Sequence, residues 1–256
     1  MPDDAPKPTI LKKSIALLDV LGTVAEPLRF TDLVNMAGLS KSSAHRILAM
    51  LVEENLVAFD ERSRTFRLGF KPMSWALKTW NTFDLPLSAD EEMRKLNRET
   101  DEHVVLAVLD EAEVVFIKKI ESRAPLTMRH QIGDRAPAHC TALGKAILAF
   151  LPEPGRAALI AGMHLPKLTE RTIADPAALV RELDTVRRQG YAVADREEQP
   201  EVRGIAAPIL DFEGKVVGAI NVWGHVFNVS REKLLGWAPL VMRAAENISR
   251  RLGHRP

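Results

Sequence analysis

The chain has 256 residues, of which 46% are hydrophobic, and its 35 lysine and arginine residues nearly balance 34 aspartate and glutamate residues. This length accommodates two domains, and the apolar content is sufficient for a buried core and too high for a disordered chain. The net charge of +1 excludes a polybasic tail but leaves room for a small basic surface that binds nucleic acid.

The cysteine content and the hydropathy exclude further classes of protein. Because Cys140 is the single cysteine, the chain can form no internal disulfide and no cysteine-rich zinc site. Residues 1–13 lack the apolar core of a signal peptide, and no apolar run approaches the roughly 20 residues that span a bilayer. We therefore predict a cytoplasmic protein that has no membrane partner, no metal and no other cofactor.

The first 70 residues predict helices followed by a β-hairpin. Residues 1–9 carry three prolines and are predicted to be a flexible arm. Apolar residues at helical spacing then predict a first helix from Ile10 to about Gly22. Two β-like runs, 56–59 and 65–68, enclose a charged turn and predict the hairpin.

Two more helices are predicted before the hairpin. Thr31 is expected to cap a short helix over 32–37, and Gly38 is expected to take a positive φ directly after it. Ser40 is expected to cap a third helix over 41–54, whose apolar residues recur at steps of three and four.

The pattern changes after a further predicted helix over 70–80, with a domain boundary near Pro86. Strand pairs mixed with helices then predict an α+β domain with a largely antiparallel sheet. The expected helices cover 88–99, 142–151, 154–162, 176–189 and 231–252, and the expected strands cover 104–109, 114–120, 205–210 and 216–222.

The segment 28–48 meets the physical needs of a helix-turn-helix, in which the amino-terminal residues of the second helix lie at the base edges of the major groove. Ser42 and Ser43 are short enough to let a helix approach the groove, and His45 and Arg46 reach further, to a phosphate or a guanine. At the hairpin tip, two arginines suit a wing that contacts the backbone or the minor groove; they are Arg62 and Arg64. The alternative is that these are solvated faces of a small helical domain.

Several blocks resemble the IclR family of bacterial transcriptional regulators, in the same order over roughly 10–253. They are 14–21, 38–48, 66–69, 137–149, 168–173, 187–191, 197–198 and 204–209. The resemblance implies a winged helix-turn-helix over 10–69, a linker helix over 70–85 and a GAF-like effector domain over 86–256. It also implies a repressor or activator that dimerises through its DNA-binding half, often as a dimer of dimers, on a palindromic or near-palindromic operator. By motif position, the first DNA contacts are Lys41, Ser43 and Arg46, followed by Ser42 and His45.

Three segments are candidates for an effector pocket: 127–144, 194–204 and 221–224. The free N–H groups of a helix that begins near Gly144 can hold a carboxylate, and Asn221 and Trp223 share one face of a strand. The resemblance implies pocket residues Met128, Ala142, Leu143, Asp195, Val202, Gly204, Asn221 and Trp223, with Cys140 and Thr141 nearby. The family often has small residues at the positions of Asn221 and Trp223, so Trp223 offers an additional stacking face. We expect a small organic acid effector, with aromatic acids among the candidates, unless Trp223 is ordinary core.

Two other functions compete with this interpretation. A hydrolase would use Cys140 or the carboxylates of Asp195, Glu197 and Glu198, but no metal or phosphate motif accompanies them. His139 and Cys140 are adjacent on an extended segment and point to opposite sides, which is unfavourable for a nucleophile and its base. The third function is a dimerising interaction module. His103 and His130 are either polar pocket groups or ordinary surface or interior histidines.

Overall fold

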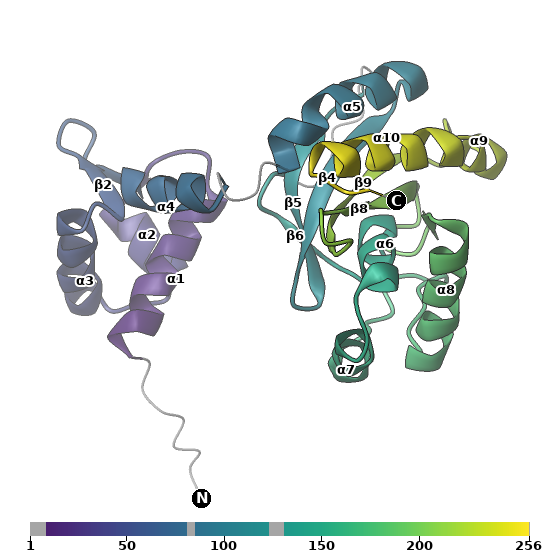
Figure 1. Cartoon of the computed structure of the whole chain (residues 1–256). Helices are drawn as coiled ribbons and strands as arrows, with labels where there is room; N and C mark the ends of the chain where they lie inside the picture. Colours follow the sequence, from purple (N-terminus) through teal and green to yellow (C-terminus); the bar gives the residue numbers. More distant parts are fainter. Residues whose placement is uncertain (1–8, 81–84, 123–130, 256) are drawn as a thin grey trace, which may run out of the picture. The chain divides into compact units, whose positions relative to one another are not determined.

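The computed structural model describes residues 9–80, 85–122 and 131–255. The chain forms two compact units, Met1–Phe83 and Asp84–Pro256 (Figure 1). Together they give the predicted α+β fold, with a helix-turn-helix in the first unit and an antiparallel sheet in the second.

The first unit has three helices, a small sheet and a fourth helix. Its three-stranded antiparallel sheet has the order β1-β3-β2. Leucines and other apolar residues that share one face of each helix form its core, among them Leu17, Leu33 and Ile47. The elements are α1 (Ile10–Thr23), β1 (Leu28–Arg29), α2 (Phe30–Met36), α3 (Lys41–Glu53), β2 (Val57–Asp60), β3 (Thr65–Leu68) and α4 (Phe70–Trp80).

The helix caps and the turn predicted for this unit are confirmed only in part. Gly38 has a φ of +64°, as predicted. The prediction that Thr31 caps α2 is wrong, because Leu28 and Arg29 pair with β3 as a strand and the chain passes directly into the helix at Phe30. Ser40 occupies the N-cap position of α3, but its side chain forms no capping hydrogen bond.

The second unit is built on a six-stranded antiparallel sheet in the order β6-β5-β4-β9-β8-β7. Helices cover both faces of this sheet. The elements are α5 (Leu85–Thr100), β4 (His103–Asp110), β5 (Glu113–Ile120), β6 (Arg135–Pro137), α6 (Ala142–Phe150), α7 (Gly155–Gly162), α8 (Pro176–Gln189), β7 (Ala192–Asp195), β8 (Val202–Leu210), β9 (Val216–His225), α9 (Arg231–Gly236) and α10 (Ala238–Arg251).

Alternation along the strands divides the core into two layers. On β4, Val105 and Ala107 join the layer that contains α6 and α8, whereas Val104 and Leu106 join the layer that contains α5 and α10. Figure 1 shows α5 and α10 running together over one side of the sheet. The sheet is therefore apolar on both faces.

Several elements of this unit differ from the predictions, including β8 and β9, which are each three residues longer than expected. Helix α5 begins at Leu85, so Pro86 lies in its first turn, where the missing N–H costs no hydrogen bond. The single helix expected over 231–252 is divided at Trp237, with Pro239 in the first turn of α10. The short edge strands β6 and β7 were not predicted.

Asp175 illustrates a cap that stabilises one of the helices over this sheet. Its Oδ2 accepts a hydrogen bond from the backbone N–H of Ala178 at 2.7 Å, at the start of α8. We expect Asp175→Ala to lower the free energy of unfolding by about 1 kcal/mol, measured by urea denaturation of the full chain. Asp175→Asn keeps a capping oxygen and should retain nearly all of the stability. Equal losses in both variants would contradict the capping role.

Candidate DNA-binding surface and ligand cavity

Helix α3 presents a polar face along its amino-terminal half. It buries Ala44, Ile47, Leu48 and Leu51 against the core of the first unit. Helical periodicity then turns the intervening residues outward: four of the predicted DNA contacts are exposed and Ser43 is half-buried. The exposed residues are Lys41, Ser42, His45 and Arg46.

His45 is also held against the preceding helix. Its ring packs edge-on against Phe30, the first residue of α2, with 6.1 Å between the ring centroids. This contact joins the two helices of the helix-turn-helix near the amino-terminal turns of α3. It restricts the orientation of the His45 side chain, which remains exposed.

The hairpin between β2 and β3 directs two arginines outward. Oδ1 of Asp60 accepts hydrogen bonds from the backbone N–H groups of Arg62 and Ser63, at 2.8 and 3.2 Å. These bonds, with that from Ser63 foremost, lower the pKa of Asp60. Arg64 adopts a φ of +57°, and Arg62 and Arg64 are both exposed. Arg67 on β3 is exposed as well, although the sequence did not single it out.

The second unit contains a cavity of about 70 Å³. It lies where the start of α6 meets strands β8 and β9 and the 197–199 loop. Its lining is mostly apolar, with a few polar side chains. The lining residues are Val105, Phe116, Cys140, Thr141, Ala142, Leu143, Ala194, Glu197, Glu198, Gln199, Val202, Gly204, Asn221 and Trp223.

Eight of the residues predicted to contact an effector line this cavity; they are Cys140, Thr141, Ala142, Leu143, Val202, Gly204, Asn221 and Trp223. Their contact with an effector stays a prediction. Met128 and His130 lie outside the described residues. The sequence missed Val105 and Phe116, because β4 and β5 could not be placed beside β9 without the sheet order. Four further lining residues lie in the candidate segment 194–204 but were not predicted individually as effector contacts; they are Ala194, Glu197, Glu198 and Gln199.

Asp195 lies outside the lining of the cavity, contrary to its predicted place in the pocket. Ala194 lines the cavity, and successive residues of a strand point to opposite faces, so Asp195 is directed away. Its carboxylate is paired with Arg171 at 2.9 Å, Arg203 at 3.1 Å and Arg231 at 3.5 Å. Three cations therefore surround this buried carboxylate.

The start of α6 forms one wall of the cavity. Thr141 caps the helix, since its Oγ1 accepts a hydrogen bond from the N–H of Gly144 at 3.0 Å. A Cβ at Gly144 would lie 2.2 Å from the carbonyl oxygen of Ala138, so only glycine allows this close approach. The N–H groups of Ala142 and Leu143 fall in the first turn, where a helix supplies no acceptor. Both residues line the cavity.

Trp223 and Asn221 point from β9 toward the same face of the sheet, as predicted, and both line the cavity. His103 is opposite Trp223 in the β4–β9 pairing, and its ring stacks on the indole at 4.4 Å and 12°. His103 is buried, and its Nδ1 accepts a hydrogen bond from the N–H of Ser122 at 3.2 Å. One face of the indole is therefore occupied by a histidine.

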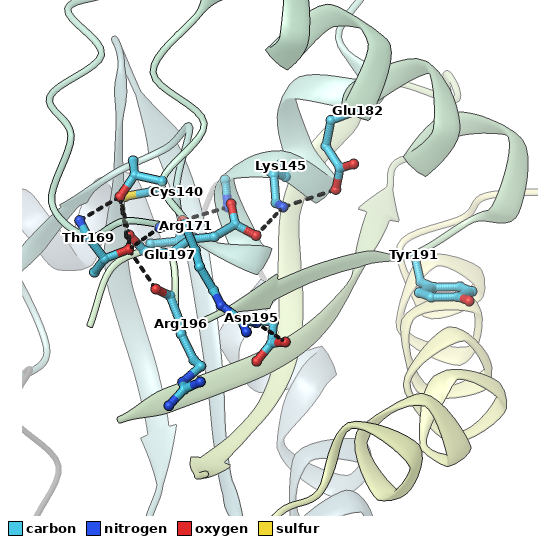
Figure 2. Close-up of polar contacts among 12 residues, drawn as sticks. Cys140, Lys145, Thr169, Arg171, Glu182, Tyr191, Asp195, Arg196 and Glu197 are labelled. Carbon is cyan, nitrogen blue, oxygen red and sulfur yellow. Dashed lines mark hydrogen bonds and ion pairs between the residues drawn. The ribbon is translucent and has the colours of Figure 1, made fainter. Parts of the chain in front are cut away.

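A buried lysine ties the cavity loop to two helices (Figure 2). Nζ of Lys145, on α6, lies 2.8 Å from Oε1 of Glu197 and 3.0 Å from Oε1 of Glu182, on α8. Burial raises the pKa of Glu197, and the ammonium of Lys145 opposes that change. The hydroxyl of Thr172 donates to the carbonyl of Glu197 at 2.6 Å and fixes the loop further.

Cys140 is buried beside the cavity as a neutral thiol. Burial raises its pKa to about 12, and the nearby carboxylates of Glu198 and Glu197 act in the same direction. His139 bonds through Nε2 to the carbonyl of Pro166 at 3.1 Å and is absent from the cavity lining, so it forms no pair with the thiol. Within the described ranges, no three His, Cys, Asp or Glu side chains gather closely enough to hold a metal ion.

No helix in the described part of the chain combines the length and the apolar character needed to cross a bilayer.

Comparison with known proteins decides the family. The family model described as bacterial transcriptional regulator IclR C-terminal matches residues 78–250, and the IclR helix-turn-helix domain matches residues 11–61. The chain belongs to the IclR family. It is thus a DNA-binding transcription regulator and not an enzyme, which overturns the hydrolase alternative.

Relatives of this regulator match it over nearly their whole length. The HTH-type transcriptional regulator KdgR of Escherichia coli (strain K12) is 33% identical, over 94% of this chain and 92% of the relative. XynR of the same organism, also an HTH-type transcriptional regulator, is 30% identical, over 95% of this chain and 97% of the relative.

Solved structures of the family share the fold. The Thermotoga maritima IclR structure has a TM-score of 0.79 at 27% identity and covers 95% of this chain and 98% of its own. An IclR homolog from Microbacterium hydrocarbonoxydans complexed with 4-hydroxybenzoate has a TM-score of 0.81 at 25% identity, covering 95% of this chain and 99% of its own.

The state of Cys140 predicts slow chemical modification. Raising its pKa from 9.0 to about 12 lowers the thiolate fraction at pH 8 by about 1,000-fold. We expect iodoacetamide to label the native protein at least that much more slowly than the urea-unfolded protein, which serves as control. The single cysteine makes the mass shift unambiguous. Native and unfolded rates within ten-fold of each other would contradict a buried, protonated thiol.

Proposed function

We propose that this regulator binds a palindromic or near-palindromic operator as a dimer, and that a small organic acid in the cavity of its second unit changes operator affinity. The observation that carries the proposal is that one chain has both an exposed polar face on α3 and a cavity at the amino-terminal end of α6. We place its action in the cytoplasm, where the operator DNA is.

For the DNA contacts, we assign the recognition role to α3 and the wing role to the hairpin tip. Short serines at the start of α3 allow close approach to the major groove, and Arg46 is long enough to reach a guanine or a phosphate. Arg62 and Arg64 on the hairpin suit contacts to the phosphate backbone or the minor groove. The assigned residues are Lys41, Ser42, Ser43, His45, Arg46, Arg62 and Arg64.

We assign dimerisation to the first unit. Large apolar side chains are exposed on α1 and α4, and such residues on neighbouring helices mark surfaces that associate. They are Ile10, Leu11 and Ile15 on α1, and Phe70, Met73 and Trp75 on α4. Two copies related by a two-fold axis would match the symmetry of a palindromic operator. A dimer of dimers is the assembly we propose on operators with two such sites.

For the effector, we propose that its carboxylate accepts hydrogen bonds from the N–H groups of Ala142 and Leu143. These groups lie at the positive end of the α6 dipole, where an anion is stabilised. The face of Trp223 that His103 leaves open offers stacking for an aromatic acid. The 4-hydroxybenzoate complex of the Microbacterium homolog supports an aromatic acid as one candidate.

We propose that the effector acts by shifting the population of two arrangements of the dimer. The effector favours one arrangement, and the helix over 70–80, as a linker, alters the spacing of the two α3 helices. Coupling energies of this kind amount to about 1–3 kcal/mol, so we expect operator affinity to change by roughly 5- to 150-fold. By reciprocity, operator DNA changes effector affinity by the same factor.

Removing Arg46 tests the DNA contact. We expect Arg46→Ala to weaken operator binding roughly 5- to 150-fold, since one arginine contact to a base contributes about 1–3 kcal/mol. The measurement is a titration of the upstream region of the protein's own gene at several salt concentrations. A pure interaction module would show no steep loss of DNA affinity as salt rises.

Arg98→Ala is the matched control, because it removes the same charge from an exposed position on α5 in the second unit. It should leave operator affinity within two-fold of the wild type. Similar losses in both variants would contradict a specific role for Arg46 and indicate a general effect of net charge.

A thermal-shift screen of carboxylic acids tests the effector class. We expect at least one acid to raise the melting temperature of the full chain and to change its operator affinity. If that acid is aromatic, Trp223→Ala should weaken it about ten-fold or more, whereas Trp223→Phe should retain most of the affinity through stacking. If no acid shifted the melting temperature, the effector part of the proposal would be rejected and the DNA part would stand.

A further inference from the structure

Two buried oxygens that line the cavity have no hydrogen-bond partner in the described part of the chain. Asn221 and Glu197 both line the cavity and are 7% and 8% exposed. Oδ1 of Asn221 and Oε2 of Glu197 are fully covered, and neither has a hydrogen-bond partner among the described residues. Buried polar atoms in folded proteins are nearly always paired, so two unpaired acceptors in one cavity require an explanation.

The surroundings of both groups, as far as the chain is described, restrict their movement toward a partner. The other oxygen of Glu197 is held by Lys145 at 2.8 Å, and the loop that carries it is fixed by Thr172. Asn221 lies between the neighbouring strands, opposite Val105 on β4 and Ala206 on β8. Exchanging its amide O and N would only replace an unpaired acceptor with an unpaired donor. With no partner for either atom in the described ranges, a ligand that enters the cavity can supply both hydrogen bonds.

The chemistry of the two groups specifies what enters. An ionised carboxylate accepts hydrogen bonds and donates none, so Oε2 of Glu197 requires an O–H or N–H donor. A bare carboxylate of the effector placed against Glu197 would instead be repelled by the like charge. A hydroxyl suits both sites, since it donates to Glu197 and either donates to or accepts from the amide of Asn221.

The volume of the cavity limits the size of the occupant. At about 70 Å³, the cavity is well below the roughly 150 Å³ of an engineered cavity that binds benzene. A short, flexible aliphatic chain can follow the shape of so small a space more easily than a rigid aromatic ring.

We propose that the effector is a compact hydroxylated carboxylic acid, whose hydroxyl groups bond to Asn221 and Glu197 while its carboxylate lies at the start of α6. This inference rests on the proposed function, because it takes the cavity to be the effector site. It narrows the class from organic acids in general to acids that carry at least one hydroxyl beside an aliphatic chain. Acids without hydroxyls leave both buried acceptors unpaired and are selected against.

The test compares acids of one skeleton that differ only in hydroxyl number. Calorimetric titration of the full-length protein would use four- and five-carbon aliphatic acids with none, one or two hydroxyls. We expect dissociation constants to fall at least ten-fold from the unsubstituted acid to the dihydroxylated acid. The matched neutral polyols, which lack the carboxylate, should bind more weakly than the hydroxylated acids.

Asn221→Leu keeps the size of the side chain and removes its polar atoms. We expect this variant to lose most of the preference for hydroxylated acids while it retains binding of the unsubstituted acid. Asn228→Leu, at an exposed position in the same unit, is the control and should keep the wild-type preference.

Glu197→Gln provides a second variant with the same shape and a neutral acceptor. Its preference for hydroxylated acids should fall between those of the wild type and Asn221→Leu. The wild-type series alone decides the question if the variants do not fold.

Each outcome separates this inference from the proposed function. If unsubstituted and hydroxylated acids bound the wild type equally, the inference would be overturned and the proposed function would stand. Tighter binding of the unsubstituted acids would also overturn the inference and leave the proposed function standing. If neither kind of acid bound, this inference would be overturned, and the screen of other carboxylic acids, aromatic ones included, would decide the effector part of the proposed function. Equal binding of neutral polyols and hydroxylated acids would overturn the carboxylate in both proposals.

Discussion

The architecture of the cavity depends on the buried ammonium of Lys145. Removing a lysine from water is costly, and the cost is offset only when carboxylates take the place of water. Here Glu197 and Glu182 do so at 2.8 and 3.0 Å, from a loop and from α8. The pairing therefore holds α6, α8 and the 197–199 loop in one arrangement. Two walls of the cavity, the start of α6 and the loop, are fixed relative to each other by this single cation.

Small residues form part of the cavity wall. Ala142, Ala194 and Gly204 line the cavity, and the surrounding core layer contains many further alanines. A Cβ at Gly204 would lie 3.1 Å from Cβ of Trp223 and 3.6 Å from the amide of Asn221. The missing side chain thus lets two larger polar and aromatic groups share the space. Close packing elsewhere keeps the cavity from collapsing.

Elements with a strong local pattern could be predicted from the sequence. The helix-turn-helix, the hairpin and most helices of the second unit follow from apolar periodicity, because each buries one face. The short strands β1, β6 and β7 could not be predicted, since two to four residues carry too little pattern and their pairing is set by distant partners. The wrong cap at Thr31 has the same origin, because β1 fixes the chain just before α2.

Only those cavity residues could be predicted that belong to a family motif or follow from the alternation of side chains along a strand. Asn221 and Trp223 lie on one strand, so their shared face followed from the sequence. Asp195 was predicted to line the pocket from the family motif alone. Side-chain alternation along β7, which the motif does not include, directs Asp195 toward three arginines instead. The role of Glu197 depends on a lysine 52 positions away in the chain, a contact that no local pattern reveals.

The same stack that covers Trp223 also links the cavity to the start of β4 and the end of α5. His103 is the first residue of β4 and follows the end of α5 by three residues, at Thr100. Its ring lies on the indole, and Val105, two residues further, lines the cavity. A ligand that displaces Trp223 therefore also acts on His103 and on the carboxyl end of α5, whose amino end begins at Leu85, beside the boundary between the two units. A ligand with equal affinity for two arrangements shifts no equilibrium. The proposed effector would therefore act through this route only if it contacts Trp223 as well as the start of α6.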